Sequence, residues 1–81
     1  MNILFVEDSF EDAELVRIEL GKAFTDFTFV HVAVGKEFED VLKNNPIDII
    51  LADYNVAGFS GIEALKLAQK LAPDLPFIIV S

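Results

Sequence analysis

Polar side chains that could carry chemistry stand directly after three apolar runs of the sequence. They are three carboxylates and one hydroxyl: Glu7, Asp8, Asp53 and Ser81. If the runs are parallel strands, these residues lie at the carboxyl-terminal edge of one sheet, where open α/β folds bind ligands. Packed carboxylates repel one another, and a hard cation such as Mg²⁺ offsets that repulsion. Because a carboxylate can also attack a phosphoryl group, the residue types predict a site for metal-assisted phosphoryl transfer.

Four apolar runs are candidates for the strands that position these residues. They span residues 3–6, 27–34, 47–52 and 77–80. The first, third and fourth are nearly unbroken, which is typical of parallel strands covered on both faces. The second alternates less cleanly, so we predict an outer strand with one wetter side. We interpret His31, which lies in this outer strand, as a structural residue.

Helical patterns separate the predicted strands. Ser9 is expected to cap the first helix, and Ser60 the third. A shorter second helix is predicted over residues 36–43, with Phe38 facing inward. The third helix should bury the stripe Ile62, Leu65, Ala68 or Leu67, and Leu71. Strands that alternate with helices in this way predict an α/β fold with a parallel sheet and helices on both faces.

The composition limits the possible functions. A length of 81 residues suits one small domain. The net charge of −8, from 14 acidic and 6 basic residues, argues against direct nucleic-acid binding, which needs a basic patch. The absence of cysteine excludes disulfides. No apolar run approaches the roughly 20 residues of a membrane span, and the amino terminus does not resemble a signal peptide, so we expect a cytoplasmic location.

The motifs together resemble the receiver domain of two-component response regulators. Residues 3–8 match the family's first strand and its acidic pair, and residues 48–53 match the third strand and its phosphoacceptor. Residues 53–61 follow the family's loop, with glycines at its glycine positions, and residues 76–81 match the fourth strand and its Ser/Thr position. Each motif alone is weak, but their order and spacing together are specific.

The resemblance implies a flavodoxin-like sheet in the order 2-1-3-4 and a function as a phosphoacceptor. A sensor histidine kinase, or a histidine phosphotransfer protein, would transfer a phosphoryl group to Asp53. Mg²⁺ would be held by Glu7, Asp8, Asp53 and the backbone carbonyl of Asn55. Ser81 would contact a phosphoryl oxygen and act as a switch. The resemblance implies a protein that is modified on its own aspartate and is not a turnover enzyme.

The sequence departs from the family's pattern in three ways. Ala57 stands where the family usually has proline, so the loop should be less stiff. None of the lysines follows a predicted strand, although the family's fifth strand ends in a lysine that pairs with the phosphoryl group. Residues 1–81 are therefore expected to be an incomplete receiver domain without the fifth strand and last two helices. The fourth strand would then be an exposed edge, and we expect self-association through it.

Alternative interpretations stay open. Taken singly, Asp8 is consistent with a helix cap or a solvated acid, and Asp53 with a turn residue. A receiver-like module that no longer switches and works only through protein contacts is the main alternative function. Phosphohydrolases that use an aspartyl phosphate resemble a different pattern, with a second Asp two residues after the nucleophile. Asn55 stands at that position here, which argues against them.

Overall fold

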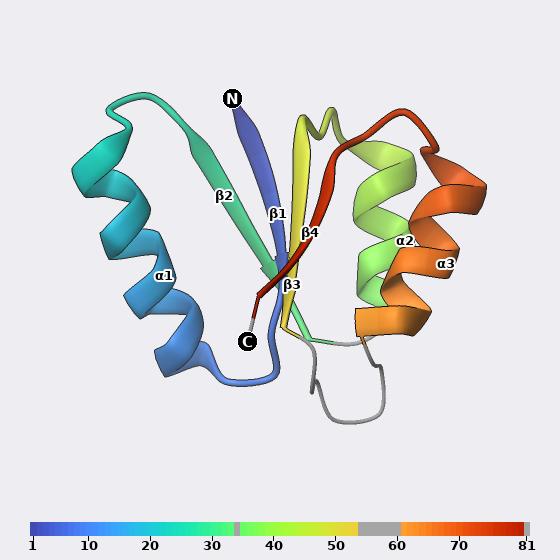
Figure 1. Cartoon of the computed structure of the whole chain (residues 1–81), viewed down its shortest axis with the longest axis horizontal. Helices are drawn as coiled ribbons and strands as arrows, with labels where there is room; N and C mark the ends of the chain where they lie inside the picture. Colours follow the sequence, from blue (N-terminus) through green and yellow to red (C-terminus); the bar gives the residue numbers. More distant parts are fainter. Residues whose placement is uncertain (34, 54–60, 81) are drawn as a thin grey trace.

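The chain alternates strands and helices along its length (Figure 1). The structure is a computed structural model that describes residues 1–33, 35–53 and 61–80. Its elements are β1 (Asn2–Val6), α1 (Phe10–Ala23), β2 (Thr28–Val32), α2 (Gly35–Asn44), β3 (Ile49–Asp53), α3 (Gly61–Leu71) and β4 (Phe77–Val80). The prediction of alternating strands and helices is confirmed. Within the described part, β2 is shorter than the predicted second strand, because pairing with β1 begins only at Thr28.

The described strands form one parallel sheet in the order β2-β1-β3-β4. This confirms the α/β class and the strand order 2-1-3-4 that the resemblance implied. The pairing register aligns Val6 of β1 with Val32 of β2 and with Ala52 of β3. It also aligns Asp53 with Val80 of β4. The carboxyl ends of β1, β3 and β4 therefore meet at the same edge of the sheet.

Helices cover both faces of the sheet, α1 on one side and α2 with α3 on the other (Figure 1). Under α1, Ile3, Phe5 and Leu51 form a buried cluster with Ala13. On the opposite face a larger cluster buries Leu4, Val6, Val32, Phe38, Ile47, Ile50, Ala52, Ala64 and Ala68. Alternate residues of β1 thus enter opposite clusters, which explains why this strand is apolar throughout.

The second and third helices pack beside each other on the sheet (Figure 1). Phe38 of α2 is fully buried, as predicted. The predicted stripe of α3 was wrong at Ile62, which is 41% exposed, whereas Ala64 is fully buried. Small side chains let the helix lie close to the sheet, so the alanines of α3 occupy the contact line and the larger residues flank it.

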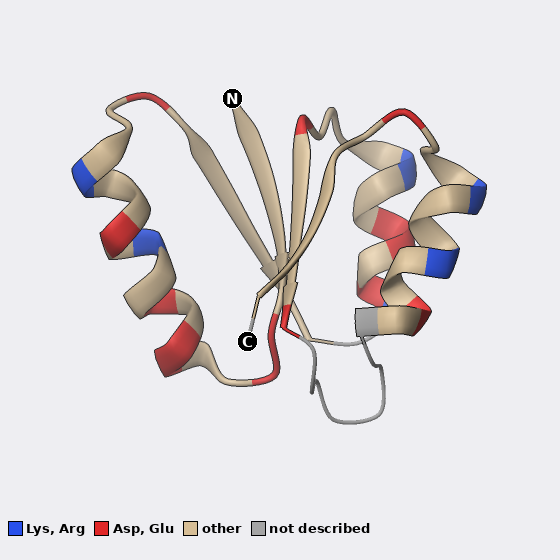
Figure 2. Ribbon diagram, in the orientation of Figure 1, with Lys and Arg blue, Asp and Glu red and all other residues tan. Residues whose placement is uncertain are grey.

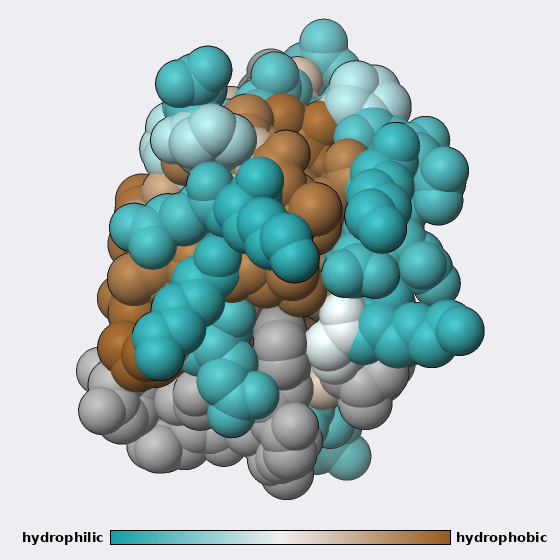
Figure 3. All heavy atoms as spheres, turned by 90° about the vertical axis from the view of Figure 1, so that its right-hand side faces the viewer, coloured by the Kyte–Doolittle hydropathy of each residue, from teal (hydrophilic) through white to brown (hydrophobic). Residues whose placement is uncertain are grey.

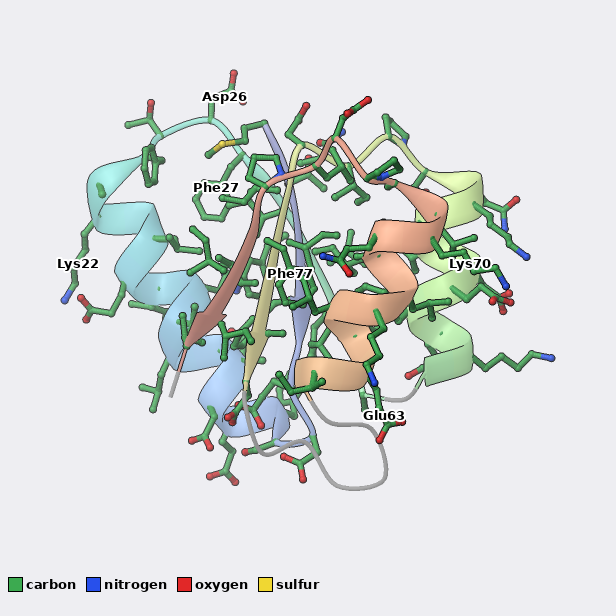
Figure 4. The ribbon with its side chains drawn as sticks, turned by 45° about the vertical axis from the view of Figure 1, so that its right-hand side comes forward. Lys22, Asp26, Phe27, Glu63, Lys70 and Phe77 are labelled. Atoms are coloured by element: carbon green, nitrogen blue, oxygen red, sulfur yellow. The ribbon has the colours of Figure 1, made fainter. Side chains whose placement is uncertain are left out.

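Strand β4 lies at one edge of the described sheet, and part of its apolar surface faces outward. Ile78 and Ile79 are 47% and 37% exposed. Phe77 instead packs against the cluster below α2 and α3 (Figure 4). Seen from the side of α2 and α3, hydrophobic residues form a continuous area of surface that is flanked by hydrophilic side chains (Figure 3). Among the helices of the described residues, none is long and apolar enough to cross a membrane.

Candidate functional site

Acidic residues gather where β1 and β3 end (Figure 2). Glu7 directly follows the last residue of β1, and Asp53 is the last residue of β3. Because Val6 pairs with Ala52, the residues that follow each of these come out side by side. The side chain of Glu7 is hydrogen-bonded to the side chains of both Asp53 and Asp8. The structure therefore brings the three carboxyl groups singled out in the sequence into one cluster.

Glu7 is the buried member of this cluster, with only 4% of its surface exposed. Asp8 is exposed and Asp53 is half-buried. The pKa of Glu7 is raised from 4.5 to about 7, first by burial and then by the hydrogen bonds to Asp53 and Asp8 and the charge of Asp53, against the lowering effect of the Ser9 amide. Near neutral pH, without a cation, Glu7 is therefore divided between its protonated and ionised forms.

The backbone around Glu7 is fixed on both sides by neighbouring elements. The Glu7 N–H donates to the carbonyl of Val32 at 3.0 Å, which extends the β1–β2 pairing by one bond. The Ser9 N–H donates to Oε1 of Glu7 at 3.2 Å. Ser9 is also the N-cap of α1, since its Oγ accepts from the Asp12 N–H at 3.2 Å, as the sequence predicted. The start of α1 is thereby tied to the side chain of Glu7.

Two of the predicted site residues, Asn55 and Ser81, lie outside the described residues. The same holds for Ala57 and the predicted cap Ser60. The structure does place Val80, the residue before Ser81, in register with Asp53.

A hollow of about 330 Å³ adjoins the acidic cluster. Its lining includes the carboxylates of Glu7, Asp53 and Asp12 together with apolar side chains of β1, α1 and β4. A larger hollow of about 590 Å³ lies beside Phe24, Phe27 and Phe29 at the other end of α1, and its described lining contains no carboxylate. Of these two hollows in the described part of the chain, the smaller one combines space for a ligand with carboxylates that can perform chemistry.

The carboxyl groups suit a small, hard cation. No group of three His, Cys, Asp or Glu side chains within the described ranges has the geometry of a formed metal centre. Mg²⁺ does not need such a cage, because it keeps several waters and uses one or two carboxylates. The clustered acids are oxygen donors, and burial together with the two neighbouring aspartates raises the pKa of Glu7; a divalent cation would offset the repulsion among these acids. The donor set therefore fits Mg²⁺.

The lysines lie apart from the strand ends that carry the acidic cluster. All of them lie in helices: Lys22 in α1, Lys36 and Lys43 in α2, and Lys66 and Lys70 in α3. Lys22 and Lys70 extend away from the sheet (Figure 4). This agrees with the expectation that no lysine follows a described strand.

One contact of the site was missed at the level of sequence. The side chain of His31, interpreted as structural, bonds through Nε2 to the backbone carbonyl of Glu7. The signal that would have pointed to it is the parallel register, which pairs His31 with Phe5 and so brings it near the end of β1. That register was not available from apolar patterning, which locates strands but does not align them.

Comparisons with known proteins agree with this geometry. No protein-family model matches the chain. The hydrogenase transcriptional regulatory protein HoxA of Cupriavidus necator is 28% identical over 79 residues, which cover 98% of this chain and 16% of HoxA. The structure of the MaeR response regulator bound to beryllium trifluoride superposes with a TM-score of 0.87 at 24% identity, covering 99% of this chain and 66% of MaeR. Full-length FixJ from B. japonicum gives a TM-score of 0.82 at 21% identity, covering 99% of this chain and 38% of FixJ.

These similarities identify the fold. The chain has the fold of response regulator receiver domains, and its described residues form four parallel strands of that fold. It spans only part of each of these proteins, about two thirds of the MaeR chain and about one sixth of HoxA.

Proposed function

We propose that this receiver domain accepts a phosphoryl group on Asp53 from a sensor histidine kinase or a histidine phosphotransfer protein. The observation that carries the proposal is the cluster at the sheet edge, where buried Glu7 is hydrogen-bonded to both Asp8 and Asp53. A carboxylate oxygen of Asp53 attacks the phosphorus of the phosphohistidine. The new O–P bond forms as the N–P bond breaks, and the electron pair leaves with the imidazole, which takes up a proton.

Mg²⁺ is the proposed cofactor, held by Glu7, Asp8 and Asp53 together with the backbone carbonyl of Asn55. When bound, it offsets negative charge on the acceptor and on the transferred group. The chain's own residues orient the acceptor. Asp53 ends β3, a buried strand in the sheet interior, and its neighbour Glu7 is fixed by hydrogen bonds to β2 and α1. Ser81 is proposed to contact a phosphoryl oxygen and to act as the switch residue.

The proteins that resemble this chain support a signalling function of this type. MaeR is a response regulator whose structure was determined with beryllium trifluoride, and HoxA is a transcriptional regulatory protein. By extension from this class, we propose a cytoplasmic signalling protein that is modified on its own aspartate and turns over no separate substrate. Residues 1–81 would supply the phosphoacceptor part of the receiver.

The test is labelling with a small-molecule phosphodonor in the presence of Mg²⁺. The parent chain should gain the mass of one phosphoryl group, whereas Asp53→Asn should not. Asp74→Asn is the matched control, because Asp74 is exposed in the turn before β4 and should label like the parent. Equal labelling of the parent and Asp53→Asn would refute Asp53 as the acceptor.

A second candidate function is a receiver-like module that works through protein contacts without switching. The position of β4 favours it, because β4 is an edge strand of the described sheet and the apolar side chains of Ile78 and Ile79 are partly exposed there. We propose that a second copy of the chain pairs with this edge. Sedimentation of the 81-residue chain should show concentration-dependent dimers that Ile78→Lys abolishes. A folded parent chain that stays monomeric across the concentration series would refute this pairing.

A further inference from the structure

The turn between β1 and α1 carries the acidic pair, and it is contacted by a side chain from a different strand. His31 of β2 bonds through Nε2 to the backbone carbonyl of Glu7. A carbonyl oxygen only accepts hydrogen bonds, so Nε2 of His31 carries the proton and donates. The ring centroid of His31 also lies 6.4 Å from the ring centroid of Phe10, the first residue of α1. One side chain thus touches both sides of the turn.

This contact begins where the backbone pairing of β1 and β2 ends. The Glu7 N–H donates to the carbonyl of Val32, the final residue of β2, and so extends this pairing to its end. The carbonyl of Glu7 lies one step further along the chain and takes its donor from the imidazole of His31. With the Ser9 N–H on its carboxylate, Glu7 is held at its amide, its carbonyl and its side chain. In Figure 1 the β1–α1 turn and the end of β2 lie at the same end of the sheet.

We propose that His31 is a positioning residue for the acidic site. By fixing the Glu7 peptide plane, the imidazole sets where the carboxylates of Glu7 and Asp8 point relative to Asp53. It acts through Glu7 and does not touch the reacting atoms. The inference rests on the proposed function in so far as Mg²⁺ is the ligand that these carboxylates serve. Groups that orient metal ligands in this way commonly affect metal affinity strongly.

The experiment compares three variants of the full chain. His31→Phe keeps an aromatic ring beside Phe10 and removes the donor. His31→Gln removes the ring and keeps an N–H donor of similar reach. Val30→Ala is the matched control. Val30 lies on the same strand as His31, but it packs against the cluster under α2 and α3, so its replacement leaves the His31 contact in place.

Calorimetric titration with MgCl₂ gives the first readout. His31→Phe should weaken Mg²⁺ binding about tenfold, whereas His31→Gln and Val30→Ala should stay within about twofold of the parent. The second readout needs no metal. In EDTA, the NMR shift of the Glu7 carbonyl carbon and the exchange rate of the Ser9 amide should change in His31→Phe and return toward parent values in His31→Gln.

The two readouts separate the inference from the proposed function. If the parent binds no Mg²⁺, the proposed function is wrong, and the metal-free readout still decides whether His31 positions Glu7. Parent-like values for His31→Phe in EDTA would overturn the positioning role. So would a His31→Gln variant as impaired as His31→Phe, because the ring and not the donor would then be responsible.

Discussion

The burial of Glu7 makes a quantitative prediction about the metal-free chain. Replacing Glu7 by Gln preserves the shape of the side chain and an N–H donor for Asp8 and Asp53, and it removes the ionisable group. In the folded chain, burial and then the contacts with the two aspartates raise the pKa of Glu7 from 4.5 to about 7. The folded state therefore binds a proton that the unfolded state has already lost between these two values.

The sign and size of the effect follow from this difference. Below pH 4.5 Glu7 is protonated in both states, and its contribution to stability is fully present. As the pH rises toward 7, the unfolded state ionises first and the free energy of unfolding falls, until the loss is complete above pH 7. The gap between 4.5 and about 7 corresponds to about 3 kcal/mol, at about 1.4 kcal/mol per pH unit. Glu7→Gln should be free of this loss.

The assay is urea unfolding of the parent and of Glu7→Gln in EDTA, at a series of pH values from 4 to 8.5. The stability of Glu7→Gln relative to the parent should rise by about 3 kcal/mol between pH 4.5 and 7 and then level off. Glu19→Gln is the control, because it removes a carboxylate from an exposed pair with Lys22 and should stay within about 0.5 kcal/mol of the parent throughout. A difference between Glu7→Gln and the parent that is flat or falling with pH would refute the reasoning.

Two further predictions concern the metal and the helix cap. Asp8→Ala should weaken Mg²⁺ binding more than Ser81→Ala does, because it removes a carboxylate while Ser81 is proposed to meet only the phosphoryl group; equal losses in a calorimetric titration would contradict the ligand assignment. Ser9→Ala should lower the free energy of unfolding by about 1 kcal/mol in urea titrations, because the Asp12 N–H loses its acceptor, whereas Ser9→Thr should retain most of it. A loss equally large in Ser9→Thr would point to a cause other than the cap.

The architecture was predictable because its signals are local and repeated. The apolar run that forms β1 is unbroken because the strand is buried on both faces of the sheet. Its residues alternate between the cluster under α1 and the cluster under α2 and α3. The cap at Ser9 is also a local signal. The wrong prediction at Ile62, in contrast, depended on a tertiary contact and not on a local signal. Whether a helix places alanine or isoleucine against a sheet depends on how closely the two approach, and the periodicity of the sequence does not contain that distance.

The proximity of Glu7, Asp8 and Asp53 was predictable from the sequence, but their different environments were not. Strand ends placed Glu7 and Asp53 at one edge without further information. The sequence did not distinguish their environments, although Glu7 is buried and Asp8, its neighbour, is exposed. That difference arises because residues next to each other leave a strand on opposite sides. The contact from His31 depends in turn on the register between β1 and β2, which only the tertiary structure sets.

A buried carboxylate whose ionisation destabilises the metal-free fold needs a physical reason to be there. If Glu7 served only packing, an amide or an apolar residue would hold the same place with less loss of stability above neutral pH. The hydrogen bonds that Glu7 donates to Val32 and accepts from Ser9 and His31 instead hold it in one orientation next to Asp53. Such preorganisation is useful where a cation has to be met by carboxylates already in place, because the repulsion among the acids is then relieved on binding. The instability assigned to Glu7 and the proposed metal affinity are on this reasoning two effects of one arrangement, so Glu7→Gln should stabilise the metal-free chain and weaken its response to Mg²⁺ together.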